Sequence, residues 1–170
     1  DNSIENVLGG ITEFEPAVLG EGFSASYVNG QWLGTILTID REDGYWIIVS
    51  GDTVLYVEGL PTDPETVYSL HGGSNLISYP FAGFAPLVET IPEDAQSSII
   101  GIIAEGESAM NTEDGWVGSL TTIFYENGYW LLVNETATLQ LTGIIIPPDY
   151  LYALHTGSNL ISYPLSECGN

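Results

Sequence analysis

The amino-acid sequence predicts an all-β protein built from two tandem, sequence-related modules of β-sandwich or barrel-like form. One observation is a repeat: Gly44-Tyr45-Trp46 recurs 84 residues later as Gly128-Tyr129-Trp130, and the phrase Tyr-x-Leu-His-x-Gly-Ser-Asn-Leu-Ile-Ser-Tyr-Pro occupies residues 68–80 and again 152–164. A second observation is that runs of β-branched and aromatic residues alternate with short turns rich in Gly, Asp and Asn. Self-similarity at a fixed period indicates a duplicated structural unit.

The individual elements follow from local patterns. Single helical turns are expected at residues 4–8 and 87–91, where glycine or proline stops them. Strands are expected over the apolar runs at residues 32–39, 45–49, 53–57, 99–104, 117–124, 129–133 and 137–141. Glu42-Asp43-Gly44 and Glu126-Asn127-Gly128 predict tight hairpins, because Asp-Gly and Asn-Gly readily adopt positive φ. Residues 63–65 and 147–149, which contain proline, are expected to form loops.

Composition restricts the partners that the chain can have. Hydrophobic residues make up 44% of the 170 residues, which excludes a disordered acidic tail despite a formal net charge of −22. Arg41 is the only strong cation, so the surface repels phosphate backbones and anionic lipid, and no nucleic-acid partner is expected. No apolar run is long enough to span a bilayer as a helix, so no membrane insertion is expected.

The two ends of the sequence give weaker signals. The chain begins at Asp1 and not at Met, as expected either after removal of a leader or where preceding residues are left out. Cys168 is the only cysteine, so an intrachain disulfide is excluded and an unremarkable thiol is expected.

The middle of the chain has an ordered set of landmarks: Asn75-Leu-Ile-Ser-Tyr-Pro80, then Trp116-Val-Gly-Ser-Leu120, then Gly128-Tyr-Trp130, then Gly143. This order resembles a tandem β-module of bacterial secreted and cell-surface proteins, in which an N-L-I-S-x-P opening strand precedes a G-Y-W strand and a final glycine. The resemblance covers most of the chain. It implies an extracellular or cell-surface location and a role in display or attachment, and it implies no particular enzymatic chemistry.

On this pattern the chain divides into three parts. Residues 1–72 form an N-terminal module that lacks its opening strand, residues 73–151 form a complete second module, and residues 152–170 form a donor strand and tail. The surplus strand consists of Asn159, Leu160, Ile161, Ser162, Tyr163 and Pro164. Because side chains alternate along a strand, Leu160 and Ser162 are expected to face one way and Ile161 and Tyr163 the other.

The surplus strand can be used in two ways. It can complete the first module of the next chain, which would make a head-to-tail homopolymer, or it can fold back and complete its own first module. Serial addition only repeats the junction already present at residues 74–91, so the sequence favours an extracellular filament subunit or fibril that assembles with itself. The alternative is a monomeric secreted adhesion or carbohydrate-binding module whose C-terminal strand closes its own first module.

No residues are expected to be catalytic, and no metal site or cofactor is expected. His71 and His155, the only histidines, hold equivalent positions in the repeat and are expected to be structural residues at strand ends. Acidic pairs such as Glu113-Asp114 lack the spacing of a calcium loop and are expected to be solvated turns.

Aromatic residues supply the remaining candidates for function. Exposed in a row, Trp32, Tyr45, Trp116 and Tyr129 could stack against the sugar rings of a polysaccharide. Neighbouring residues of a strand face opposite sides, however, so at least one residue of each Tyr-Trp pair is expected to enter a core.

Overall fold

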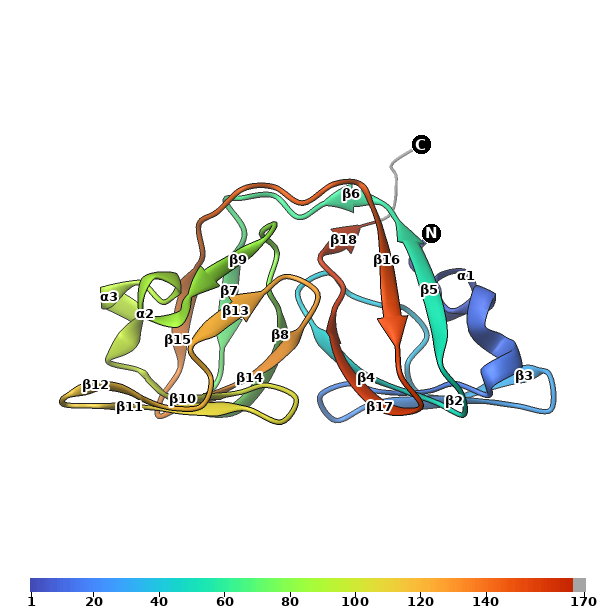
Figure 1. The fold of residues 1–170 in the computed structure, drawn as a ribbon, viewed down its shortest axis with the longest axis horizontal. Helices are drawn as coiled ribbons and strands as arrows, with labels where there is room; N and C mark the ends of the chain where they lie inside the picture. The colour runs from blue at the N-terminus through green and yellow to red at the C-terminus, as the bar shows by residue number, and fades with distance from the viewer. Residues whose placement is uncertain (167–170) are drawn as a thin grey trace.

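The structure, a computed structural model, describes residues 1–166 and is mostly antiparallel β-sheet (Figure 1). The first half of the chain contains α1 (Ile4–Val7), the 3-10 helix η1 (Gly9–Phe14), β1 (Ala17–Leu19), β2 (Ser24–Val28), β3 (Gln31–Gly34), β4 (Gly44–Val49), β5 (Thr53–Glu58), β6 (Leu60–Pro61), β7 (Val67–Leu70) and β8 (Gly73–Ser78). The second half contains β9 (Phe84–Pro86), α2 (Leu87–Thr90), α3 (Glu93–Gln96), β10 (Ile99–Ile103), β11 (Ser108–Thr112), β12 (Gly115–Gly118), β13 (Thr122–Phe124), β14 (Gly128–Val133), β15 (Ala137–Gln140), β16 (Asp149–Leu154), β17 (Gly157–Ser162) and β18 (Leu165–Ser166).

Two five-stranded sheets lie side by side along the lower edge of the view in Figure 1. Their strand orders are β17-β4-β1-β2-β3 and β12-β11-β10-β14-β8, and the two orders correspond through the sequence repeat. The equivalent strands β4 and β14 also share one burial pattern, in which Tyr45 and Tyr129 point inward while Trp46 and Trp130 are half-buried. The expectation of an all-β fold is therefore confirmed.

The two halves exchange their last strands. β8, from the first half of the sequence, pairs along its whole length with β14, and β17, from the end of the chain, pairs in the same way with β4. The preceding strands are exchanged as well, since β7 pairs with β15 and β16 pairs with β5. We call the part of the molecule with the β17-β4-β1-β2-β3 sheet the first lobe and the part with the β12-β11-β10-β14-β8 sheet the second lobe. Each lobe in Figure 1 is completed by strands from the other copy of the repeat, within a single chain.

The exchange of strands determines which residues form each of the two hydrophobic cores. One core combines residues between Ile4 and Val57 with residues between Ile146 and Leu165. The other core uses residues between Tyr68 and Leu141. β7 lies just before the expected module, 73–151, and β16 crosses the end of that module; each packs in the core of the lobe that receives it.

The predicted hairpins at residues 42–44 and 126–128 are wrong. β4 pairs with β1 and β17, and β14 pairs with β10 and β8, so neither strand pairs with the segment before its turn. The expected strand at residues 32–39 also ends early, at Gly34, where φ is +150° and a Cβ atom would lie 2.2 Å from the Ser24 carbonyl oxygen. Gly118 ends the equivalent strand in the same way, so the chain leaves the sheet before each turn begins.

Other local expectations agree with the structure. The helical turns at residues 4–8 and 87–91 correspond to α1 and α2, and the Ser3 hydroxyl caps α1 by accepting a hydrogen bond from the Asn6 amide. Within residues 1–166 no helix has the length and apolar character needed to cross a membrane. Cys168 lies outside the described residues.

Candidate functional site

The predicted donor strand is held inside its own chain. All six residues of β17 are in register with β4, from Gly157 opposite Val49 to Ser162 opposite Gly44. Ile161 and Tyr163 enter the first core, as the alternation of side chains predicts. Leu160 is buried on the other face, toward Gly128 of the second lobe, and Pro164 is buried just beyond the strand.

The free edge of β17 is covered by the second lobe. The Leu160 amide donates a 2.9 Å hydrogen bond to the Glu105 carboxylate, and the Ser162 amide donates a 3.1 Å bond to the Glu126 carbonyl oxygen. β8 is held in the same way, by the Glu21 carboxylate and the Glu42 carbonyl oxygen. Each exchanged strand therefore has partners on both edges, which removes the unpaired edge that promotes aggregation.

Two serine hydroxyls join the lobes where the edges of β8 and β17 contact the opposite lobe. Ser162 Oγ accepts a 2.7 Å bond from the Tyr79 amide and donates a 2.5 Å bond to the Asn127 carbonyl oxygen. Ser78 Oγ makes the reciprocal pair, accepting from the Tyr163 amide at 2.7 Å and donating to the Asp43 carbonyl oxygen at 2.5 Å. Both serines are fully buried. We call the contacts made by the edges of β8 and β17 with the opposite lobe the seam.

Glycines allow the backbones to approach closely at the same place. A Cβ atom at Gly44 would lie 2.7 Å from the Ile77 carbonyl oxygen, and one at Gly128 would lie 2.6 Å from the Ile161 carbonyl oxygen. Contacts below 3.0 Å are not found for real Cβ atoms, so the first residue of each G-Y-W strand must be glycine for the seam to close.

The histidines lie at the outer end of the seam. His155 Nε2 is 2.8 Å from Glu105 Oε1, and His71 contacts Glu21 in the equivalent way. The His155 ring also contacts the Thr156 carbonyl oxygen, and this bond, followed by the contact with Glu105, raises the pKa of His155 above its ordinary value. The pKa of His71 is raised by the matching contacts with the Gly72 carbonyl and Glu21. The two histidines thus sit in separate sites, His71 between β7 and β8 and His155 between β16 and β17.

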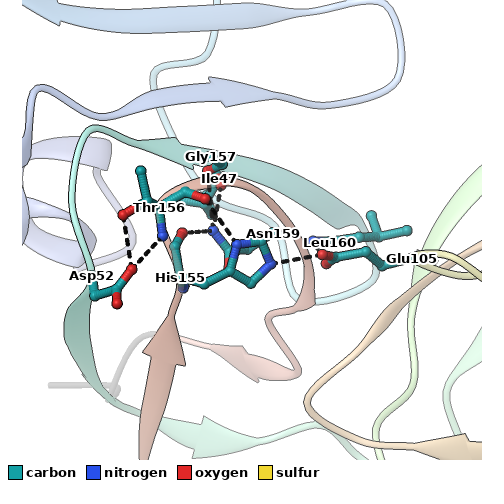
Figure 2. Close-up of polar contacts among 8 residues, drawn as sticks. All are labelled: Ile47, Asp52, Glu105, His155, Thr156, Gly157, Asn159 and Leu160. Carbon is teal, nitrogen blue, oxygen red and sulfur yellow. Dashed lines mark hydrogen bonds and ion pairs between the residues drawn. The ribbon is translucent and has the colours of Figure 1, made fainter.

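The turn that leads into β17 is fixed from two directions. Asn159 closes it by accepting a 2.9 Å bond from the His155 amide and returning one to the His155 carbonyl oxygen. Asp52 of the first lobe accepts bonds of 2.7 and 2.8 Å from the amide and hydroxyl of Thr156. Figure 2 shows Asp52 and Glu105 approaching this segment from opposite sides.

The four aromatic candidates separate into two pairs. Tyr45 and Tyr129 are buried in the two cores, where their hydroxyls accept bonds from the Asp40 and Phe124 amides, and so neither ring can reach a sugar. Trp32 and Trp116 lie half-buried on β3 and β12, the outermost strands of the two sheets. The four residues are not brought together into one row.

The first lobe has a groove at its tryptophan. The Trp32 ring packs edge-on against Tyr27 at a centroid distance of 5.5 Å, and these rings line a groove of about 480 Å³ together with Glu5, Thr12 and Gln31. The counterpart of Tyr27 in the second lobe is Asn111, whose side-chain amide donates to the Gln96 and Ile99 carbonyl oxygens. The second lobe therefore has no aromatic ring at this position beside Trp116.

A larger hollow of about 550 Å³ in the first lobe has an acidic lining that includes Glu21, Asp40 and Asp43. Partial desolvation, followed by repulsion from Asp40 and other carboxylates, raises the pKa of Asp43 to about 6. Within residues 1–166 the structure brings together no group of three or more acidic, histidine or cysteine side chains that could hold a metal ion.

The sequence predicts the donor strand, Ser162 included, but not the contacts that hold it. No role is predicted for Glu21, Glu105 or Ser78, although each is identical to its counterpart in the other copy of the repeat. That identity was the available signal. It could not show that each side chain bonds to the other copy, because the contacts of Glu21 with Leu76 and of Ser78 with Tyr163 span many residues. Comparison of the chain with protein-family models, curated proteins and solved structures gave no match.

Proposed function

We propose that this chain is a non-enzymatic extracellular module, closed on itself by strand exchange, that attaches to neutral polysaccharide through the groove at Trp32. Closure rests on β17, which has partners on both edges within its own chain. The two lobes would correspond to the β-sandwich or barrel-like modules that the sequence predicts, the first of them completed in cis.

The groove supports the choice of ligand. Sugar rings bind proteins by stacking against aromatic faces while carboxylate, amide and hydroxyl groups bond to the sugar hydroxyls. Trp32 and Tyr27 supply the aromatic faces, and Glu5, Gln31 and Thr12 supply the polar groups. A chain with a net charge of −22 would repel uronate or sulfate polymers, which makes a neutral polysaccharide the better partner.

Pull-down on insoluble neutral glucans and chitin tests this function. Trp32→Ala is expected to reduce the bound fraction at least about tenfold, as for an aromatic residue at the centre of an interface. Trp116→Ala, at the equivalent position of the other lobe, is the matched control and should bind like the unmodified chain. Equal binding by the two variants, or no binding of the unmodified chain to any neutral polymer, would remove the proposal.

A second function, a head-to-tail filament, is favoured by the reciprocity of the exchange. The segment β16–β17 and the segment β7–β8 make equivalent contacts with the opposite lobes, so the same contacts could form between two chains if β16–β17 opened. Electron microscopy of the purified chain separates the two functions. Filaments that disappear when residues 157–170 are deleted support trans donation, whereas discrete particles at all salt concentrations contradict it.

A further inference from the structure

The seam contains a cavity of about 300 Å³ with an unusual lining. Its lining includes Tyr150 and Tyr152 from β16, Glu105 and Glu126 from the second lobe, and His155. This volume is at the small end of the range for ligand pockets, and it is sufficient for a single side-chain head group.

Glu126, which lines this cavity, has one carboxylate oxygen without a partner. Glu126 Oε2 is fully buried, and among residues 1–166 no hydrogen-bond donor reaches it. The backbone of Glu126 is fixed, because its carbonyl oxygen accepts the Ser162 amide at the seam. A buried carboxylate without a donor costs free energy of folding, so its position calls for a cation or another donor to complete it.

Three tyrosine rings pack on one another close enough to this carboxylate for its charge to act on them. Tyr150 packs edge-on against Tyr125 at 4.9 Å and against Tyr152 at 4.8 Å between centroids. Burial, followed by the negative charge of Glu126, raises the pKa of Tyr150, so its ring stays neutral and retains its negative face. Aromatic faces beside a carboxylate are the arrangement that binds ammonium and guanidinium groups.

The first lobe carries a cation at the corresponding place in its own sequence. The position equivalent to Tyr125 is Arg41, and the positions equivalent to Tyr150 and Glu126 are Thr66 and Glu42. The charge of Arg41 acts on the buried Tyr68, where it offsets part of the rise in pKa that burial causes. No side-chain oxygen of Glu42 is left buried without a partner. In the second lobe Tyr replaces the arginine, and the chain has no other strong cation to supply.

We propose that the cavity between Tyr150 and Glu126 binds an organic cation, an alkylammonium or guanidinium group, from outside the chain. The cation would bond to the Glu126 carboxylate and lie against the Tyr150 ring. Its source is either a free amine or a lysine or arginine side chain of a partner protein. This inference does not depend on the polysaccharide groove, because the groove at Trp32 and this cavity have no lining residue in common.

Titration followed by NMR tests the proposal on the unmodified chain in about 0.15 M salt, where weak attraction to the acidic surface is screened. The probes are N-acetyl-lysine methylamide and N-acetyl-arginine methylamide, with N-acetyl-norleucine methylamide as the neutral control and putrescine as the free amine. Saturable shifts of the Glu126 and Tyr150 amides are expected with the cationic probes and not with norleucine. Tighter binding of the amino-acid probes than of putrescine would indicate a protein partner, and the reverse would indicate a free amine.

Two pairs of variants separate this site from general attraction of cations. Glu126→Gln is expected to weaken binding about tenfold, as for loss of a charged partner. Glu42→Gln removes the same charge from the equivalent position and should change affinity less than twofold. Tyr125→Arg, which copies the first lobe, should abolish binding and raise the unfolding temperature, while Tyr150→Thr should weaken binding without unfolding the chain. Equal effects of Glu126→Gln and Glu42→Gln, or equal binding of the lysine and norleucine probes, would overturn the proposal.

Discussion

Position 43 is an aspartate in the first lobe, and its counterpart in the second lobe, position 127, is an asparagine. The backbone carbonyl of each accepts the same 2.5 Å bond from a seam serine, so the difference leaves the seam intact. Arg41 and Tyr125 also differ at equivalent positions, as do Tyr27 and Asn111. The side chains that bond across the seam are the same in the two lobes, whereas Tyr27 lines the groove at Trp32 and Tyr125 packs against Tyr150 of the cavity. The comparison therefore identifies the positions that can give the two lobes different binding properties.

The largest expected effect is on the exchanged strands themselves, where the lobes are alike. Ile161→Asp would place a carboxylate in the first core, and Ile77→Asp would do the same in the second. Each is expected to lower the free energy of unfolding by about 4 kcal/mol or more, because an unpaired charge replaces buried apolar surface. Urea unfolding measures this, with Ser158→Asp at an exposed position of β17 as control. A tolerated Ile161→Asp beside a disruptive Ile77→Asp would show that β17 does not complete the first core.

The seam serines should give a smaller and coupled effect. Ser78→Ala and Ser162→Ala each remove a buried hydroxyl that makes two hydrogen bonds, which should cost about 2 kcal/mol. Their effects should not add, because both hydroxyls lie in one network between the lobes. A double-mutant cycle by thermal unfolding measures the coupling. Strictly additive losses would mean that the two lobes close independently.

Asp43→Asn copies the second lobe and should stabilise the chain at neutral pH. The pKa of Asp43 is raised from 3.8 to about 6, so folding favours its neutral form, and its contribution to stability is present below pH 3.8 and is lost as the pH rises through 6. The carboxylate is partly exposed, so screening should limit the gain at pH 7 to less than about 1 kcal/mol. Thermal unfolding at pH 7 and pH 4 should show the gain only at pH 7. A loss of stability at pH 7 would mean that Asp43 has a cationic partner.

The smallest expected effect is at the exposed histidines. Glu105→Gln should lower the pKa of His155 toward its ordinary value of 6.5 but not fully to it, because the bond to the Thr156 carbonyl remains. His71 in the same sample is the internal control and should not change. Since the folded pKa is raised, the stabilisation by each histidine is complete below pH 6.5 and is lost as the pH rises through the raised value. NMR titration of the two rings measures both, and an unchanged His155 would show that Glu105 does not bond to it.

Local pattern predicted much of this fold. Strands such as β4 and β5 are visible as β-branched and aromatic runs, and the repeat identified β17 as a strand without a place in its own module. Which strands pair with each other could not be predicted in the same way. Asp-Gly at residues 43–44 is typical of a hairpin, but Gly44 instead lies against the backbone of Ile77 in an exchanged strand. A local pattern cannot show such a contact.

The candidate sites were predicted less completely than the fold. Trp32 could be chosen from its residue type, but the burial of Tyr45 depends on which face of β4 meets the core. The cavity at Glu126 gave no local signal, because it forms only where β16 meets the second lobe. Its traces in the sequence are the changes from Arg41 to Tyr125 and from Thr66 to Tyr150 between otherwise similar repeats.

The central claim is that β17 completes the first lobe of its own chain, and a designed cross-link tests it most directly. Ser158 and Ile48 are opposite each other in the register of β17 and β4, so cysteines at these positions are close enough to form a disulfide. With Cys168 replaced by serine, oxidation of the Ser158→Cys/Ile48→Cys variant in dilute solution should give a monomer of altered mobility on non-reducing gels. A ladder of covalent dimers and higher multimers would contradict the account and show that the strand is donated to a neighbouring chain.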